Sequence, residues 1–224
     1  MSAYDKNTIE IQYQECARER EEILADLKEH IIAVNEPLEG NSFYYHDSLN
    51  LHPDLYTKQL NLFWAGQQAE TKICEIGFNA GHSSMLFLLG RPKTPLSFTV
   101  FDIGLHRYVR PCLQYIKERF THVNFEYVEG DSIETIPKWL KEHPAEEGTF
   151  DVVHMDGGHL EPYVASDFKN CDRLVKKGGI LIVDDTNSTI ITRYLEKYLK
   201  TGNYEEVSIL ATAGYPHRIL RRIK

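Results

Sequence analysis

Cysteines are few in this sequence, and none forms a C-x-x-C pair. The chain has 224 residues and four cysteines, which lie far apart. Free thiols on a strand or a helix face behave as small hydrophobes, and this usage fits a reducing compartment. The first residues carry charged and polar groups instead of the apolar core of a signal peptide. We therefore expect a cytoplasmic protein.

Long apolar runs and an excess of basic residues are also missing. No run approaches the roughly 20 residues that a membrane span needs, and the net charge is -8 with histidine neutral. A nucleic acid favours a basic face, and the short basic patch at the C-terminus is typical of a solvated last strand. We expect neither a membrane nor a nucleic acid as a partner.

The N-terminal part, residues 1–71, shows helical periodicity but no functional motif. Apolar residues recur at three- and four-residue steps over residues 8–34, which predicts one long amphipathic helix capped by Thr8. This helix lies on its own domain or forms the seam of a homodimer, and Arg20 within its apolar stripe favours the first interpretation. The pattern then predicts two further segments: a loop at residues 35–53 and a helix at residues 54–68.

From residue 72 onward the sequence alternates between strand and helix patterns. Such repeated units predict a mostly parallel sheet with helices on both faces. No helix separates the last two strands, and Gly214-Tyr215-Pro216 signals a turn, so these strands should form an antiparallel hairpin. The expected fold is α/β: a Rossmann-like, doubly wound, seven-stranded sheet with an N-terminal helical extension. The predicted strands are residues 72–76, 97–102, 124–129, 150–155, 179–183, 205–210 and 217–222, and the helices between them are residues 83–89, 108–120, 133–141, 164–174 and 190–199.

The most informative stretch follows the first predicted strand and reads Glu75-x-Gly77-x-x-x-Gly81. Its two glycines let the backbone bend sharply and let a ligand approach, because no Cβ stands in the way. A phosphate-binding turn relies on bare backbone N–H groups, so a negative charge at Glu75 does not suit it. A cationic ligand with a ribose does, which favours S-adenosylmethionine over a dinucleotide.

Carboxylates follow all five of the strands that we expect to be parallel. Ligands bind outside the carboxyl ends of the strands of an open α/β sheet, so these acids should share one rim. Asp102 can accept two hydrogen bonds from the cis-diol of a ribose, or it can cap the following loop. Asp131 can contact a cofactor, cap the next helix, or do both. The acids of this rim are Glu75, Asp102, Asp131, Asp156, and the pair Asp184 and Asp185.

Asp156, Asp184 and Asp185 suggest a metal site. Neighbouring strands lie about 4.8 Å apart, and carboxylates crowded there repel one another unless a cation such as Mg²⁺ compensates. Successive residues of a strand point to opposite faces, so Asp184 and Asp185 can both ligate only where the strand has ended. Alternatively, one of this pair caps the next segment and Asp156 only lines a cofactor pocket. His159, three residues after Asp156, is either a general base or a surface histidine.

These motifs, in this order, resemble those of class I S-adenosylmethionine-dependent methyltransferases, from about residue 72 to the C-terminus. The glycine turn matches the first motif of that family, Asp102 matches its ribose-binding acid, and Gly130-Asp131-Ser132 matches its adenine-side motif. More narrowly, Asn79, His82, the segment Met155-Asp156-Gly157-Gly158-His159 and the Asp184–Asp185 pair resemble the small-molecule O-methyltransferase branch. That branch includes macrolide sugar methyltransferases and cephalosporin hydroxylase-like proteins.

The resemblance divides the chain into a helical extension or lid, residues 1–71, and a cofactor-binding methyltransferase domain, residues 72–224. It implies metal ligation by Asp156, Asp184 and Asp185, and proton transfer by His159. The residues that it implies as contacts of S-adenosylmethionine are Glu75, Gly77, Phe78, Asn79, Gly81, His82, Ser83, Asp102, Ile103, Asp131, Ser132 and Asp156.

The expected activity is S-adenosylmethionine-dependent methylation of a hydroxyl on a small molecule or sugar. The sulfonium is a good leaving group, so the protein mainly has to align the acceptor with the methyl. A bound metal, possible in this site as Mg²⁺, would lower the pKa of the acceptor hydroxyl. The first alternative is a nicotinamide-dependent oxidoreductase, against which the missing G-x-G-x-x-G speaks. The second is a relative that binds the cofactor without catalysis.

Overall fold

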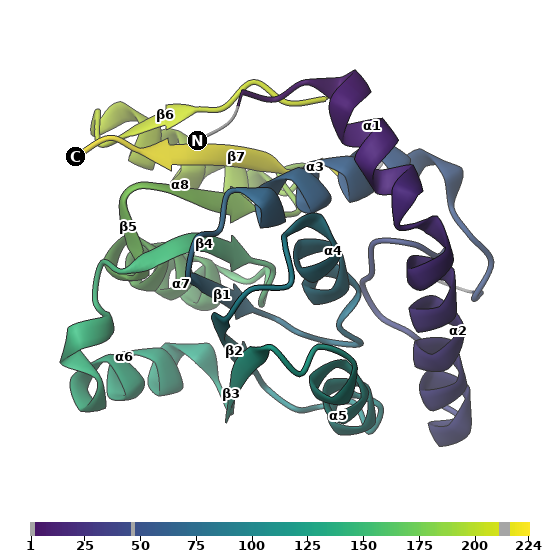
Figure 1. The fold of residues 1–224 in the computed structure, drawn as a ribbon. Helices are drawn as coiled ribbons and strands as arrows, with labels where there is room; N and C mark the ends of the chain where they lie inside the picture. The colour runs from purple at the N-terminus through teal and green to yellow at the C-terminus, as the bar shows by residue number, and fades with distance from the viewer. Residues whose placement is uncertain (1–2, 46–47, 211–215) are drawn as a thin grey trace.

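The computed structural model describes residues 3–45, 48–210 and 216–224. Its centre is a seven-stranded sheet in the order β3-β2-β1-β4-β5-β7-β6 (Figure 1). Neighbours from β3 to β5 are parallel, whereas β7 runs antiparallel to both β5 and β6. The predicted Rossmann-like sheet and its C-terminal hairpin are thus confirmed. The strands are β1 (Lys72–Ile76), β2 (Leu96–Asp102), β3 (Val123–Glu129), β4 (Phe150–Met155), β5 (Val175–Val183), β6 (Tyr204–Glu206) and β7 (Arg218–Arg222).

Helices cover both faces of this sheet, because its strands are apolar on both sides. Ile73 packs into one buried cluster, together with α1 to α5, and the next residue, Cys74, packs into a second cluster with α6 to α8. Successive strand residues point to opposite faces, which makes two separate cores (Figure 1). The helices are α1 (Lys6–Glu15), α2 (Ala17–Val34), α3 (Tyr56–Gln67), α4 (His82–Gly90), α5 (Val109–Arg119), α6 (Ser132–Glu142), α7 (Glu161–Leu174) and α8 (Thr189–Lys200), with the short 3-10 helices η1 (Pro53–Leu55) and η2 (Pro144–Glu146).

The single N-terminal helix that we predicted is wrong, because α1 and α2 are separated at Cys16. The guanidinium of Arg20 lies 3.7 Å from the centre of the Tyr13 ring and donates a hydrogen bond of 2.6 Å to the Tyr13 carbonyl. That carbonyl would bond to the fourth residue along in an unbroken helix. Asp5, not Thr8, caps the start of α1 by accepting from the N–H of Asn7.

The apolar stripe of these two helices is buried in the core of the chain itself. Ile9, Tyr13, Ile23, Leu27 and Ile31 are each at most 2% exposed, and they share one cluster with residues of the sheet. The stripe is therefore covered without a second copy. A homodimer through this region and the division of the chain at residue 71 stay predictions.

Element boundaries differ most at the C-terminal hairpin. β6 ends at Glu206, although we expected it to continue to residue 210, whereas β5 begins four residues before its predicted start. Gly214 and Tyr215, the predicted turn, lie outside the described residues. None of the helices that the structure describes combines the length and the apolar character that a membrane span requires.

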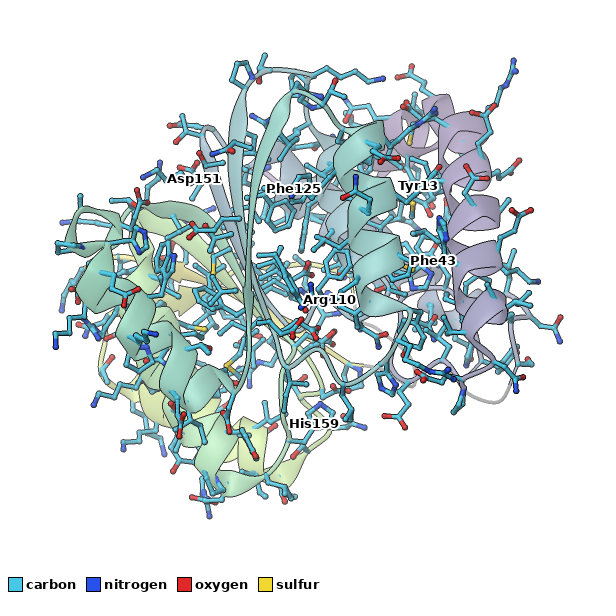
Figure 2. The ribbon with its side chains drawn as sticks, turned by 90° about the horizontal axis from the view of Figure 1, so that it is seen from below. Tyr13, Phe43, Arg110, Phe125, Asp151 and His159 are labelled. Carbon is cyan, nitrogen blue, oxygen red and sulfur yellow. The ribbon has the colours of Figure 1, made fainter. Side chains whose placement is uncertain are left out.

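Asp151 fastens the amino end of β1 to β4. Its Oδ2 accepts backbone N–H groups of Glu70, Thr71 and Lys72 at 3.0, 2.6 and 2.8 Å. Its Oδ1 pairs with the ammonium of Lys176. Figure 2 shows Asp151 and His159 at opposite ends of the sheet, so this cluster is structural and remote from the strand ends where a ligand would bind.

We expect Asp151→Ala to lower the free energy of unfolding by about 2–4 kcal/mol, because three partly buried N–H groups lose a charged acceptor. Urea unfolding followed by circular dichroism measures this change. Glu147→Gln is the control, because Glu147 forms an ion pair with Arg173 at the surface, and such pairs contribute about 0–1 kcal/mol. Equal effects of the two substitutions would contradict a fastening role for Asp151.

Candidate active site

Two glycines shape the turn that follows β1. Gly77 has φ +90 and Gly81 has φ +79, which are left-handed values that residues with a Cβ rarely adopt. A Cβ on Gly77 would collide with the backbone oxygen of Asp156, and one on Gly81 would collide with the ring of Phe78. The turn therefore lies directly against the end of β4, which only glycine permits.

Asp102, at the end of β2, holds this turn in place. Its Oδ2 accepts the backbone N–H groups of Phe78 and Asn79 at 2.8 and 2.9 Å, and its Oδ1 accepts the N–H of Gly104 at 2.7 Å. Asp102 thus caps its own loop, as the alternative interpretation proposed. It also lines the neighbouring pocket, so the position predicted for a ribose contact is available to it.

Asp131 plays a similar double part at the end of β3. Its side chain accepts the N–H of Ile133 at 2.9 Å and so caps α6. The capping interpretation is confirmed, and Asp131 still lines the pocket. Its predicted contact with an adenine stays a prediction.

Glu75 lies beneath the turn rather than within the described lining of the pocket. Its carboxylate is fully buried, accepts from the hydroxyls of Ser83 and Ser84, and lies 2.9 Å from Nδ1 of His154. A direct contact with a cofactor would require Glu75 to leave these partners. Its charge instead fixes the first turn of α4, at which Ser83 faces the pocket.

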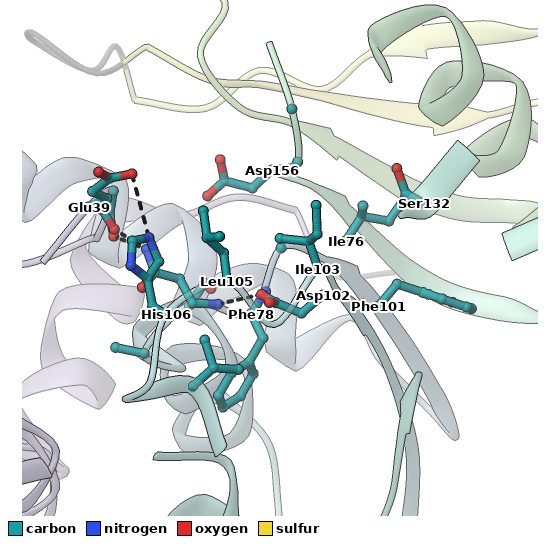
Figure 3. Close-up of a pocket in the computed structure, with 18 of the residues that line it drawn as sticks. Glu39, Ile76, Phe78, Phe101, Asp102, Ile103, Leu105, His106, Ser132 and Asp156 are labelled. Atoms are coloured by element: carbon teal, nitrogen blue, oxygen red, sulfur yellow. Dashed lines mark hydrogen bonds and ion pairs between the residues drawn. The ribbon is translucent and has the colours of Figure 1, made fainter. Parts of the chain in front are cut away.

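The pocket occupies about 380 Å³ at the carboxyl ends of the strands. In the close-up of Figure 3, Glu39 and Ser132 lie on opposite sides of it, with Asp156 between them. Glu75, Gly81 and Asp184 are outside its described lining. The predicted site residues that do line it are Gly77, Phe78, Asn79, His82, Ser83, Asp102, Ile103, Asp131, Ser132, Asp156, His159 and Asp185.

Residues 39–42 of the N-terminal region form one wall of this pocket, which no sequence motif indicated. The side-chain amide of Asn79 donates to the carbonyls of Glu39 and Gly40. The carboxylate of Glu39 lies 3.5 Å from the ring of His106 (Figure 3). The glycine turn and the loop after β2 therefore hold this segment across the pocket.

His159 and Asp185 form a pair at the other end of the pocket. Nε2 of His159 lies 2.8 Å from Oδ2 of Asp185, and the histidine side chain is 56% exposed. The hydrogen bond to Asp185 raises the pKa of His159 above its ordinary value. β5 has already ended at Val183, and Asp185 has φ +51. Asp184 and Asp185 consequently face different surroundings.

Asp184 points into the protein, where it meets a lysine from α3. Its Oδ2 forms an ion pair with the ammonium of Lys58, and its Oδ1 accepts the N–H of Asp185 at 3.0 Å. The side chains of Lys58 and Asp184 are both buried. Burial alone would lower the pKa of Lys58, but the negative charges of Asp184 and Asp156 outweigh burial and raise it.

A row of alternating charges runs from this ion pair to the glycine turn. Nε2 of His154 lies 3.8 Å from Oδ2 of Asp184, and its Nδ1 bonds to Glu75. Burial opposes the charged form of His154, yet its two acidic partners raise its pKa to about 10. Burial and the nearby Asp184 raise the pKa of Asp156 to about 7. The acids of the rim are thus not equivalent.

The predicted magnesium ligands are not assembled as one set in the described residues. Ligand atoms of Asp156, His159 and Asp185 lie within 4.8 Å of one another, and so do those of His154, Asp156 and Asp184. Asp156 belongs to both groups, but Asp184 and Asp185 do not share one. Because Lys58 already engages Asp184, the residues present do not fit the metal site that the sequence suggested.

Sequence reasoning missed Lys58, and it included residues 39–42 only as part of a helical extension or lid that spans residues 1–71. Lys58 could have been noticed because it lies within a predicted helix, α3. The structure shows that the residues that follow it in α3, up to Gly66, are all buried. His154 is a core histidine, since its side chain is fully buried and paired with Glu75. Residues 39–42 gave no signal of their own.

A glycine turn, acids at the strand ends and a pocket between them are features of an α/β protein whose ligand site lies at the carboxyl edge of its sheet. A family model described as a methyltransferase domain matches residues 74–186, just over half of the 224 residues. The chain belongs to this methyltransferase family. No curated protein matches the sequence.

Solved structures share the fold over most of the chain. The O-methyltransferase from Bacillus cereus in complex with SAH is 17% identical, with a TM-score of 0.61 and coverage of 91% of both chains. Cofactor-bound Rv0187 from MTB is 17% identical, with a TM-score of 0.62, over 90% of this chain and 89% of that one. Apo CalS11, a TDP-rhamnose 3'-O-methyltransferase, is 17% identical, with a TM-score of 0.59, over 88% and 92%. The predicted class of methyltransferase is confirmed, and nothing in these comparisons supports an oxidoreductase.

Proposed function

We propose that this chain transfers a methyl group from S-adenosylmethionine to a hydroxyl of a small molecule. The observation that carries this proposal is the single pocket that joins the glycine turn to the His159–Asp185 pair. The cofactor supplies a methyl group on a sulfonium. Gly77, Asp102 and Asp131 are the residues that would hold it, because they combine close backbone approach with hydrogen-bond acceptors.

His159 is the proposed proton acceptor. Its Nε2 donates to Asp185, which leaves Nδ1 as the ring nitrogen that can accept a proton. Asp185 fixes this tautomer and stabilises the imidazolium that forms. Residues 39–42 and His159 lie at the walls of the same pocket, so an acceptor bound between them would meet Nδ1.

The charges of the pocket favour an acceptor that is neutral or cationic. Its lining contains five carboxylates, and neither lysine nor arginine occurs among the described residues that line it. A phosphate or carboxylate in this place would face repulsion without a compensating cation. An acceptor such as the TDP-sugar named for CalS11 would therefore bind poorly. The carboxylates are Glu39, Asp102, Asp131, Asp156 and Asp185.

The proposal includes no magnesium bound jointly by Asp156, Asp184 and Asp185, since Asp184 is paired with Lys58 and does not line the pocket. The proton is removed by His159 alone, and the acceptor is aligned by the pocket walls. A cytoplasmic location stays a prediction from the sequence.

Calorimetry with S-adenosylhomocysteine and with NAD tests the proposal. We expect one S-adenosylhomocysteine per chain and no heat from NAD. Methyl transfer is then measured on matched acceptors, a neutral sugar or phenol and its phosphorylated form, with the neutral form preferred. Binding of NAD alone would favour the oxidoreductase. Cofactor binding without transfer to any acceptor would favour a non-catalytic relative.

A further inference from the structure

Lys58 is an unusual residue for the first turn of a buried helix. Its side chain is 6% exposed, and its ammonium reaches from α3 to Asp184, just past the end of β5. A charge in such a place is costly unless it is paired. Because burying its charge costs free energy, we expect Lys58 to have a specific role in this position.

The neighbours of Lys58 on α3 show how this helix is held in place. Gln59 accepts a hydrogen bond of 2.6 Å from the hydroxyl of Tyr13 and donates one of 2.8 Å to the carbonyl of Ser42. Asn61 lies 3.1 Å from Nε2 of His217. These bonds tie α3 to α1, to the wall formed by residues 39–42, and to the start of β7. The position of the Lys58 ammonium is therefore fixed by the surrounding structure.

The charges around Lys58 leave little room for a second cation. The ammonium of Lys58 already fills the position beside Oδ2 of Asp184, and Nε2 of His154 lies 3.8 Å from the same oxygen. A divalent ion placed beside Asp184 would have to displace the ammonium from this ion pair and leave it in the protein interior without its direct partner. Such an uncompensated buried charge costs several kcal/mol.

We propose that Lys58 is the built-in cation of this site, and that it occupies the place of a divalent metal at Asp184. Lys58 is thus a positioning residue: it keeps Asp184 ionised and turned inward, away from Asp185 and from the pocket. Methyl transfer by this chain then needs no divalent ion at Asp184. This last point rests on the proposed function, whereas the exclusion of metal from Asp184 does not.

The experiment measures metal binding, which is independent of activity. The native chain is titrated with Mn²⁺, followed by the loss of the free-ion signal in electron paramagnetic resonance. We expect no saturable binding that depends on Asp184 below about 1 mM, the weak end of protein sites for divalent ions. In Lys58→Met the acids lose their cation, and we expect one saturable site with affinity at least about tenfold higher.

Two further variants control for structure and charge. Lys58→Met combined with Asp184→Asn removes both charges and should not gain the Mn²⁺ site, and Lys58→Arg keeps the cation and should behave as the native chain. Saturable Mn²⁺ binding by the native chain that is lost in Asp184→Asn would overturn the proposal, even if Lys58→Met did not fold. A folded Lys58→Met chain that gains no Mn²⁺ site would overturn it as well.

Discussion

We expect His159→Ala to lower kcat for methyl transfer by about 10²–10⁴-fold, the range that a positioned general base contributes. The imidazole is the basic group that the pocket presents beside Asp185. Without it the acceptor proton must pass to water. The affinity for S-adenosylhomocysteine should stay within about twofold of the native value, because the glycine turn and Asp102 are unchanged. A twofold change is small, since a tenfold change in affinity corresponds to only about 1.4 kcal/mol. Single-turnover kinetics and calorimetry measure the two quantities separately.

The partner of the histidine supplies the matched variant. Asp185→Asn keeps the shape but removes the charge that orients the ring, so we expect a smaller loss, of about tenfold. His159→Gln, which cannot take a proton, should be as slow as His159→Ala. Full activity in His159→Gln would show that the proton leaves by another route.

The pH dependence of this step has a definite sign. A general base must be neutral to act, and the hydrogen bond from Asp185 raises the pKa of His159 above its ordinary value. The rate should therefore fall as the pH drops through this raised pKa, and it should level off above it. Asp185→Asn removes the main cause of the raised pKa of His159. The fall in the rate of methyl transfer should therefore occur at lower pH in this variant. A profile that is identical in both proteins would contradict the pairing.

Local patterns carried most of the fold prediction. The strands at Lys72–Ile76 and Phe150–Met155 are apolar runs closed by glycine turns, and both were predicted within their observed bounds. The break at Cys16 was not predicted, because it depends on one side-chain contact, Arg20 over Tyr13. Periodicity continues across the break and cannot register it. The early end of β6 likewise depends on pairing with β7 rather than on its own sequence.

The candidate site, like the fold, has features that the sequence predicted and others that it did not. Motif residues such as Asp102 and Asp131 follow strands directly, so topology alone brings them to one rim. What each carboxylate meets there depends on distant segments: Lys58, more than a hundred residues earlier, decides that Asp184 turns inward. One sequence lists the acids of the rim but not their partners. The metal hypothesis rested on that list, and the described geometry does not bring Asp184 and Asp185 into one set of ligands.

Asp102→Ala should weaken binding of S-adenosylhomocysteine by about 10²-fold. The carboxylate accepts three backbone N–H groups, from Phe78, Asn79 and Gly104. Hydrogen bonds to a charged group contribute about 1.5–3 kcal/mol each, and 1.4 kcal/mol is a tenfold change in affinity. Losing the acceptor frees the glycine turn, so the ligand must order the turn as it binds, and it also removes the proposed acceptor for a ribose.

A matched substitution at the same level of the sheet separates these effects from a general loss of charge. Glu129 is the partner of Asp102 in the register of β2 and β3, yet it lies outside the described lining of the pocket. Glu129→Gln should leave the affinity within about twofold. Asp102→Asn retains one acceptor oxygen, so its affinity for S-adenosylhomocysteine should lie between those of Asp102→Ala and Glu129→Gln. Calorimetry gives the affinities, and circular dichroism checks that each chain is folded. If Asp102→Ala bound S-adenosylhomocysteine as tightly as Glu129→Gln, Asp102 would be a loop cap and nothing more, and the cofactor would have to be held by Asp131 and the turn alone.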